Sequence, residues 1–150
     1  MLKMETIVRC AQTEDIQRLI AFLNEASLGT DGVEESIEFF LIMEDENGRI
    51  NATLGIEPLG KYGLLRSLAI TQQASESDLM LIFNQMLKLA REKELESLYL
   101  ATNKHSSLPF FSLIGFEQEK KENLPQELFS SDHVNHILTV DNSLFMVLNL

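Results

Sequence analysis

The chain has 150 residues, a formal net charge of −11, 45% hydrophobic residues and 23% charged residues. This length and composition indicate one globular domain spanning residues 1–150, and they exclude disordered, collagen-like and fibrous chains. Twelve basic against 23 acidic residues argue against nucleic acid and anionic lipid as partners, because both need a dense basic surface.

The first half of the chain predicts a strand, a helix and then three strands. Residues 6–11 are β-prone, and Thr13 follows as an N-cap before a helical pattern over residues 14–26. Three strand-like runs come next, at residues 39–43, 49–57 and 64–70. Asn47 and Gly48 form a strong hairpin signal between the first two runs. These runs therefore predict an antiparallel meander.

The second half alternates helices with strands. Residues 75–94 carry the clearest helical pattern, and residues 107–114 predict a short helix that ends at Gly115. Further strands are expected at residues 95–101, 116–120 and 143–148. The intervening residues 124–142 are loosely patterned. This order predicts an α/β (α+β mixed) fold, with a mixed central sheet of about six to seven strands and helices on both faces.

Together with this order, LLRSLAI at residues 64–70 and PFFSLIGFE at residues 109–117 resemble the GNAT superfamily of N-acetyltransferases. The resemblance covers nearly the whole chain. It is greatest to the branch that includes arsenic-resistance-type N-acetyltransferases, and it also rests on residues 98–102, Leu124, Pro125 and Met146. It implies the acyl-CoA N-acyltransferase fold, acetyl-CoA as co-substrate and a small amine as acceptor.

The resemblance also implies where acetyl-CoA would bind. The pantetheine arm would form hydrogen bonds with the main chain of Leu68 and Ile70, as an added strand does. The pyrophosphate would lie on unpaired N–H groups at the start of the following helix. Members of the family usually have a basic residue there, followed by glycine, any residue and glycine. This chain has Ser75 at the basic position, and Glu76 and Asp78 at the glycine positions.

These acids support two interpretations. Two charges about 4 Å apart interact by roughly 1 kcal/mol in water and about 4 kcal/mol at an effective dielectric of 20. If Glu76 and Asp78 face the pyrophosphate, their repulsion would therefore weaken coenzyme binding on the order of a hundredfold or more. Alternatively, Ser75 and Asp78 form a capping box, the helix needs no phosphate, and the usual coenzyme site is lost. An altered binding mode would use N–H groups near Ser77.

Acetyl transfer to an amine requires a base and often an acid that protonates the departing thiolate. In many relatives a tyrosine is that acid. Here Phe111, which has no proton to give, occupies the corresponding position, and we expect it to contact the coenzyme. Glu57 is the candidate base, with a salt bridge to Arg66 or Lys61 as the alternative. Arg66, expected on the strand face of Leu68, either binds an acidic substrate group or lies over an apolar surface.

Two further candidates follow the strand expected at residues 95–101. Asn103 resembles a residue that often contacts the coenzyme, although turn formation is an equal alternative. His105 lies in a loop where relatives bring substrate and coenzyme together, and it is either a general base or an exposed loop residue. His133 and His136 are three residues apart, but no third spaced ligand accompanies them, so we expect no metal.

The first functional hypothesis is a GNAT-family N-acetyltransferase that acts on a small amine. The second is a non-catalytic GNAT-fold domain that binds a small ligand or a protein partner, and the third is a homodimer assembled through sheet edges. The single cysteine, Cys10, cannot form an internal disulfide. The longest apolar run, residues 39–43, is too short to cross a bilayer. We therefore expect a cytoplasmic protein that does not bind membranes.

Overall fold

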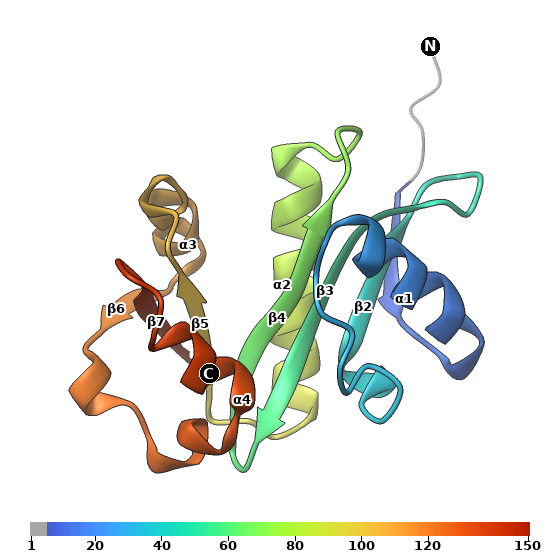
Figure 1. Ribbon diagram of the computed structural model, residues 1–150. Coiled ribbons are helices and arrows are strands. Elements are labelled where there is room, and N and C mark those ends of the chain that lie inside the picture. The colour runs from blue at the N-terminus through green and yellow to red at the C-terminus, as the bar shows by residue number, and fades with distance from the viewer. Residues whose placement is uncertain (1–5) are drawn as a thin grey trace. The chain divides into compact units, whose positions relative to one another are not determined.

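The computed structural model describes residues 6–150 (Figure 1). The strands are β1 (Ile7–Cys10), β2 (Phe40–Glu44), β3 (Ile50–Leu59), β4 (Tyr62–Ile70), β5 (Ser97–Thr102), β6 (Glu117–Glu119) and β7 (Leu144–Asn149). The α-helices are α1 (Ile16–Glu25), α2 (Glu76–Glu92), α3 (Leu108–Ile114) and α4 (Asp132–Ile137). The strands form one sheet in the order β1-β2-β3-β4-β5-β7-β6. The predicted mixed sheet with helices is confirmed.

Local signals predicted several boundaries well. The hairpin turn at Asn47-Gly48 is confirmed, since Gly48 has a φ of 77° and its N–H donates to the Asp45 carbonyl. Gly115 ends α3 with a φ of 124°. The prediction of Thr13 as an N-cap is wrong, because a 3-10 turn begins there and the Asp15 carboxylate accepts the N–H of Gln12 instead.

The chain divides into two compact units, and we describe each by itself. Unit 1 comprises Arg66–Leu89 and the described part of Met1–Ile56, and unit 2 comprises Glu57–Leu65 and Ala90–Leu150. The expectation of a single domain stays a prediction.

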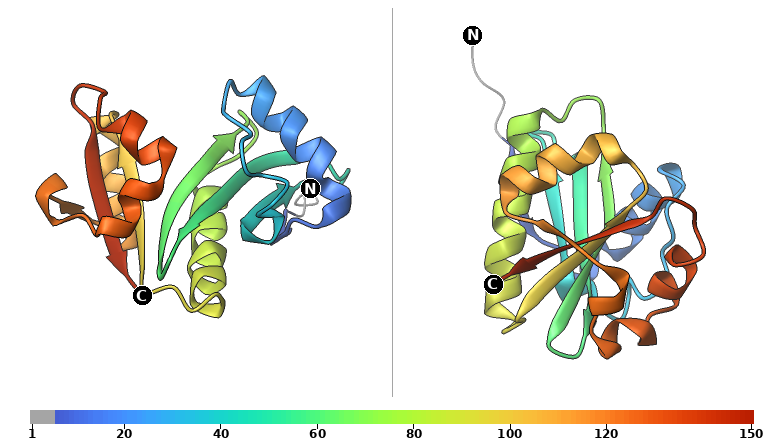
Figure 2. Two further views of the ribbon diagram at one scale, coloured as in Figure 1. Left: turned by 60° about the horizontal axis from the view of Figure 1, so that its bottom comes forward. Right: turned by 90° about the vertical axis from the view of Figure 1, so that its left-hand side faces the viewer.

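Unit 1 has helices on both faces of its part of the sheet, with α1 on one side and α2 on the other (Figure 2). Leu19 and Leu23 of α1 pack against Phe40 and Ile42 of β2 and against Ala69 of β4. Strand β2 pairs antiparallel with both β1 and β3. Its apolar run from Phe40 to Met43 is buried throughout, as expected for an interior strand covered on both faces.

Gly55 of β3 has no room for a side chain, because Phe40 is its partner on β2. A Cβ at Gly55 would lie 2.6 Å from Cδ1 and 2.9 Å from Cζ of this fully buried ring. We expect Gly55→Ala to lower the free energy of unfolding by about 1–3 kcal/mol, the usual effect of overpacking a core. Urea denaturation measures the loss. The control is Gly29→Ala, where a Cβ meets nothing within 4 Å; equal stability of the two variants would contradict the prediction.

Unit 2 is built around β5, β7 and β6. β7 pairs antiparallel with both neighbours, and Tyr62–Leu64 of β4 pair in parallel with Ser97–Tyr99 of β5. The loosely patterned region contains α4 and two short 3-10 helices, Lys121–Asn123 and Gln126–Ser130. Its apolar side chains complete a core cluster with strand residues, whose buried members are Leu59, Leu64, Tyr99, Leu124, Leu128, Val134 and Phe145.

Candidate functional site

Strand β4 changes its alternation at Ser67, which has a φ of 58°. The carbonyl of Ser67 accepts a hydrogen bond of 2.9 Å from the hydroxyl of the fully buried Thr53. A residue in this conformation breaks the regular reversal of side chains along a strand. Arg66 and Ala69 therefore both lie on the Phe40 side of β4. The expectation that Arg66 shares a face with Leu68 is wrong for this reason.

Arg66 holds the loop between α1 and β2 against β4. Its Nη1 donates to the Asp31 carbonyl at 2.7 Å, and its Nε donates to the Ser67 hydroxyl at 3.1 Å. The guanidinium lies 5.5 Å from the centre of the Phe40 ring, which is within reach of a cation–π interaction. This arrangement matches the alternative in which Arg66 lies over an apolar surface. Its binding of an acidic substrate group stays a prediction.

Leu68 and Ile70 point away from the Phe40 side and are exposed by 37% and 48%, whereas the intervening Ala69 is exposed by 6%. Two large apolar side chains therefore lie at the surface beside the backbone that was predicted to bind the pantetheine arm. An apolar or extended ligand would remove their area from water.

The capping box at the start of α2 is confirmed. The Ser75 N–H donates to the Asp78 carboxylate at 2.9 Å, and the Asp78 N–H donates to the Ser75 hydroxyl at 3.1 Å. The start of a helix has backbone N–H groups without a partner inside the helix. The capping box occupies those of Ser75 and Asp78, so those of Glu76 and Ser77 remain for a ligand. Both of these residues are exposed. No lysine or arginine occurs between Ser67 and Leu87, so no basic side chain in this stretch offsets the two acids.

Glu57, the candidate base, is half-buried on β3 in unit 2. The Ser131 hydroxyl donates to its Oε1 at 2.5 Å, and the same hydroxyl oxygen accepts the N–H of Val134 as the N-cap of α4. Lys61, one predicted partner of Glu57, instead lies 3.6 Å from the Glu96 carboxylate. The sequence interpretation missed Ser131, although Ser131 followed by Asp132 is an ordinary helix-start signal.

The remaining candidates also lie in unit 2. Asn103 is exposed directly after β5. His105 is exposed in a 3-10 helix, and its Nε2 is 3.3 Å from the Asn142 carbonyl. Phe111 is buried. Its ring packs edge-on against two neighbouring rings, with ring centres 5.8 Å apart for Phe110 and 6.3 Å apart for Phe116. Its role as a coenzyme contact stays a prediction.

The predicted residues thus fall into two groups. Unit 1 holds Arg66, Leu68, Ile70, Ser75, Glu76, Ser77 and Asp78, and unit 2 holds Glu57, Asn103, His105 and Phe111. Within residues 6–150, no group of three or more His, Cys, Asp or Glu side chains is arranged to hold a metal ion. In the same part of the chain, no helix combines the length and apolar character needed to span a membrane.

One curated protein is clearly related to this chain. It is the uncharacterized protein YwlB from Bacillus subtilis (strain 168), which is 39% identical over 127 residues, corresponding to 84% of this chain and 85% of YwlB. No protein-family model matches the chain.

Solved structures are similar along almost the whole chain. N-acetylglutamate synthase from Neisseria gonorrhoeae, complexed with coenzyme A and N-acetyl-glutamate, has a TM-score of 0.77 and 18% identity over 99% of this chain, which spans only 36% of that protein. Rv2747 from Mycobacterium tuberculosis, in complex with CoA, has a TM-score of 0.75 and 20% identity over 96% of this chain and 99% of its own. A GNAT-family acetyltransferase from Staphylococcus aureus Mu50 has a TM-score of 0.70 and 20% identity over 97% and 99% of the two chains. These likenesses confirm the predicted fold; the arsenic-resistance-type branch stays a prediction.

Proposed function

The chain belongs to the family of Bacillus subtilis YwlB and has the GNAT fold, and from this premise we propose that it is an acetyl-CoA-dependent N-acetyltransferase acting on a small amine. The observation that carries the proposal is the extent of the fold. A GNAT-family acetyltransferase matches 97% of this chain over 99% of its own length, and structures of the same fold contain coenzyme A.

The residues present fit one part of acetyl-CoA better than another. When bound, acetyl-CoA supplies the activated acetyl group. The backbone of β4 beside Leu68 and Ile70 suits the pantetheine arm, because the two apolar side chains are already at the surface. The start of α2 suits the pyrophosphate poorly, because Asp78 occupies the Ser75 N–H and Glu76 adds a second negative charge. We therefore propose that coenzyme binding is weak and depends on β4.

Glu57 is the base in this proposal. A substrate amine is protonated near neutral pH, and a carboxylate that removes its proton leaves the lone pair free to attack the thioester carbonyl. The Ser131 hydroxyl donates to only one carboxylate oxygen of Glu57, so the second oxygen remains for the substrate. This hydrogen bond also fixes the orientation of the carboxylate. Phe111 cannot protonate the departing thiolate, so in this proposal the thiolate takes up, through water, the proton that the newly acylated nitrogen loses.

A second function is favoured by one specific observation, the capping box of Ser75 and Asp78. A helix that satisfies these N–H groups internally has no need of a phosphate. In this alternative the chain is a non-catalytic GNAT-fold domain that binds another small ligand or a protein partner.

Calorimetric titration with acetyl-CoA at low and moderate salt distinguishes the two functions. We expect binding that is weaker than micromolar but still measurable at millimolar acetyl-CoA. Added salt should not weaken binding as it does at a basic phosphate site, because salt screens the repulsion from Glu76 and Asp78. S-acetylpantetheine, which lacks the pyrophosphate, is the control ligand and should bind about as tightly. Absence of binding at millimolar concentration would reject the enzyme, and micromolar binding would show that these carboxylates do not oppose the coenzyme.

A further inference from the structure

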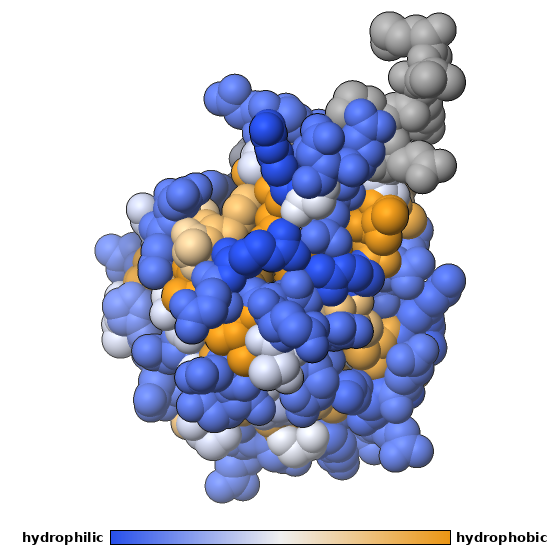
Figure 3. Space-filling view, turned by 90° about the vertical axis from the view of Figure 1, so that its right-hand side faces the viewer, coloured by the Kyte–Doolittle hydropathy of each residue, from blue (hydrophilic) through white to orange (hydrophobic). Residues whose placement is uncertain are grey.

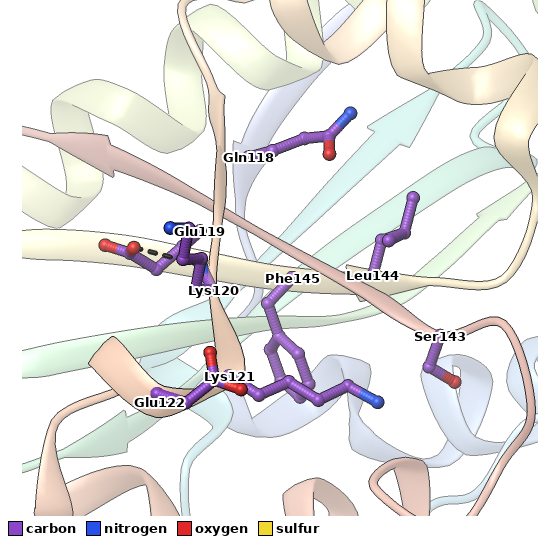
Figure 4. A pocket seen from close by; sticks show the side chains of 8 residues that line it. All are labelled: Gln118, Glu119, Lys120, Lys121, Glu122, Ser143, Leu144 and Phe145. Atoms are coloured by element: carbon purple, nitrogen blue, oxygen red, sulfur yellow. Dashed lines mark hydrogen bonds between the residues drawn. The ribbon is translucent and has the colours of Figure 1, made fainter.

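A cavity of about 360 Å³ opens where the pairing of β6 with β7 ends (Figure 4). The last pair of this ladder is Glu119 with Phe145. Beyond it the chain leaves β6 and turns into the 3-10 helix Lys121–Asn123, so the first residue of β7, Leu144, lies past the end of its neighbour. None of the residues predicted for acetyl transfer lines this cavity.

One part of the lining is apolar and ordered. Phe145 is 1% exposed and belongs to the core of unit 2, whereas the half-buried Leu144 points to the other side of β7 (Figure 4). Leu144 is fixed from the other side by its pairing with Thr102 of β5. The aromatic part of the lining is therefore the Phe145 ring, and aromatic side chains are common in small-ligand sites.

The basic side chains at the cavity are unusual for this acidic protein. Lys120 and Lys121 are the only two adjacent basic residues in the sequence, and both line the cavity. Neither forms an ion pair within the described residues 6–150, in contrast to Arg9, Arg18 and Lys61. An ammonium group without a carboxylate partner, next to an apolar surface, favours an anion from solution.

The acidic side chains of the lining are arranged differently. The Glu119 carboxylate accepts the Lys120 N–H at 3.0 Å and the Asn123 side-chain amide at 3.3 Å. Figure 4 shows it directed to the side opposite Ser143, whereas the Lys121 side chain extends below the Phe145 ring toward Ser143. The other lining acid, Glu122, is exposed to solvent. The Lys121 ammonium and the Phe145 ring are therefore on the same side of β7.

We propose that this cavity binds a small organic anion with a carboxylate attached to an apolar group. The carboxylate contacts the Lys121 ammonium, and the Ser143 hydroxyl, which also lines the cavity, donates a hydrogen bond to it. The apolar group lies on the Phe145 side of β7. This site is separate in its residues from the proposed acetyl transfer, and it does not depend on that function.

The test is a set of NMR titrations of the ¹⁵N-labelled full chain. Phenylacetate is the probe, phenylacetamide is its neutral analogue, and inorganic phosphate is an anion without an apolar group. We expect saturable shifts of the Lys121 and Leu144 amide signals with phenylacetate alone. Lys121→Met should weaken binding by roughly tenfold or more, the effect of removing a hydrogen bond to a charged group. The control Lys88→Met changes an exposed lysine of α2 and should leave the affinity unchanged.

Three results with the unaltered protein would overturn the proposal. They are the absence of saturable shifts with millimolar phenylacetate, equal binding of phenylacetamide, and equal binding of phosphate. Thermal unfolding of Lys121→Met and Lys88→Met shows whether a loss of binding reflects a loss of fold. If both variants unfold at the temperature of the unaltered protein and Lys121→Met still binds phenylacetate as well as Lys88→Met does, Lys121 is not part of the site.

Discussion

Asp15→Asn is expected to lower the free energy of unfolding by about 3–5 kcal/mol, the usual cost of breaking a buried ion pair by removing one partner. Asp15 is 5% exposed. Its carboxylate accepts hydrogen bonds from Arg9 at 2.7 and 2.9 Å, from Arg18 at 3.0 Å and from the Gln12 N–H at 2.8 Å. Both arginines also bind Glu44. The lower end of this range is the better expectation, because the Arg9 and Arg18 side chains are 33% and 43% exposed.

The same network makes stability depend on pH. The Arg9 guanidinium holds the pKa of Asp15 well below its usual range, and it also lowers the pKa of Glu44. Carboxyl groups whose folded-state pKa is lowered stabilise the fold above their unfolded pKa values, which are near 4, and this stabilisation is lost as the pH falls through the folded-state values. The urea midpoint should therefore decrease below about pH 5, and it should decrease less in Asp15→Asn.

The control for Asp15→Asn is Asp31→Asn, at an exposed residue of unit 1 whose backbone carbonyl, not its carboxylate, binds Arg66. Urea denaturation at several pH values measures both variants. An equal loss of stability in the two, or the same pH dependence as in the unaltered protein, would contradict a structural role for the Asp15 network.

Figure 3 shows the side of the molecule viewed from the right of Figure 1, where strongly hydrophilic side chains lie between separate apolar patches.

The sequence predicted those features that depend on neighbouring residues. The capping box of Ser75 and Asp78 and the helix end at Gly115 each need a few consecutive residues, so composition and spacing are sufficient. The strand expected at residues 143–148 corresponds to β7, because its apolar run is uninterrupted and has no polar face. The order of these elements, together with the family motifs, was enough for the fold.

Features that join distant segments were not predictable in this way. The network of Asp15 brings together β1, the turn before α1 and β2, and no spacing pairs Arg9 with Glu44. The hydrogen bond between Ser131 and Glu57 likewise joins residues far apart in the sequence. Ser67 carries no signal for a positive φ, because serine adopts it only when the surrounding structure requires it. The sequence therefore predicted the local elements on which the candidate residues lie, and it missed their tertiary contacts.

The double variant Glu76→Gly with Asp78→Gly is expected to increase the affinity for acetyl-CoA on the order of a hundredfold. It removes two negative charges and two Cβ atoms from the start of α2, and it frees the Ser75 N–H that the Asp78 carboxylate now occupies. The loss of the capping box and two glycines in the first turn should lower the free energy of unfolding by about 1–2 kcal/mol. Calorimetric titration and thermal unfolding measure the two effects.

A second pair, Glu76→Gln with Asp78→Asn, separates charge from space. It keeps both Cβ atoms and a side-chain oxygen that can accept the Ser75 N–H, but it removes both charges. If charge opposes the pyrophosphate, this pair should gain most of the affinity of the glycine pair, whereas a steric obstacle would leave it close to the unaltered protein. Glu92→Gln at the other end of α2 is the control and should change nothing. Unchanged affinity in both double variants would mean that the coenzyme does not bind at the start of α2, which would leave β4 as its principal contact or favour the non-catalytic alternative.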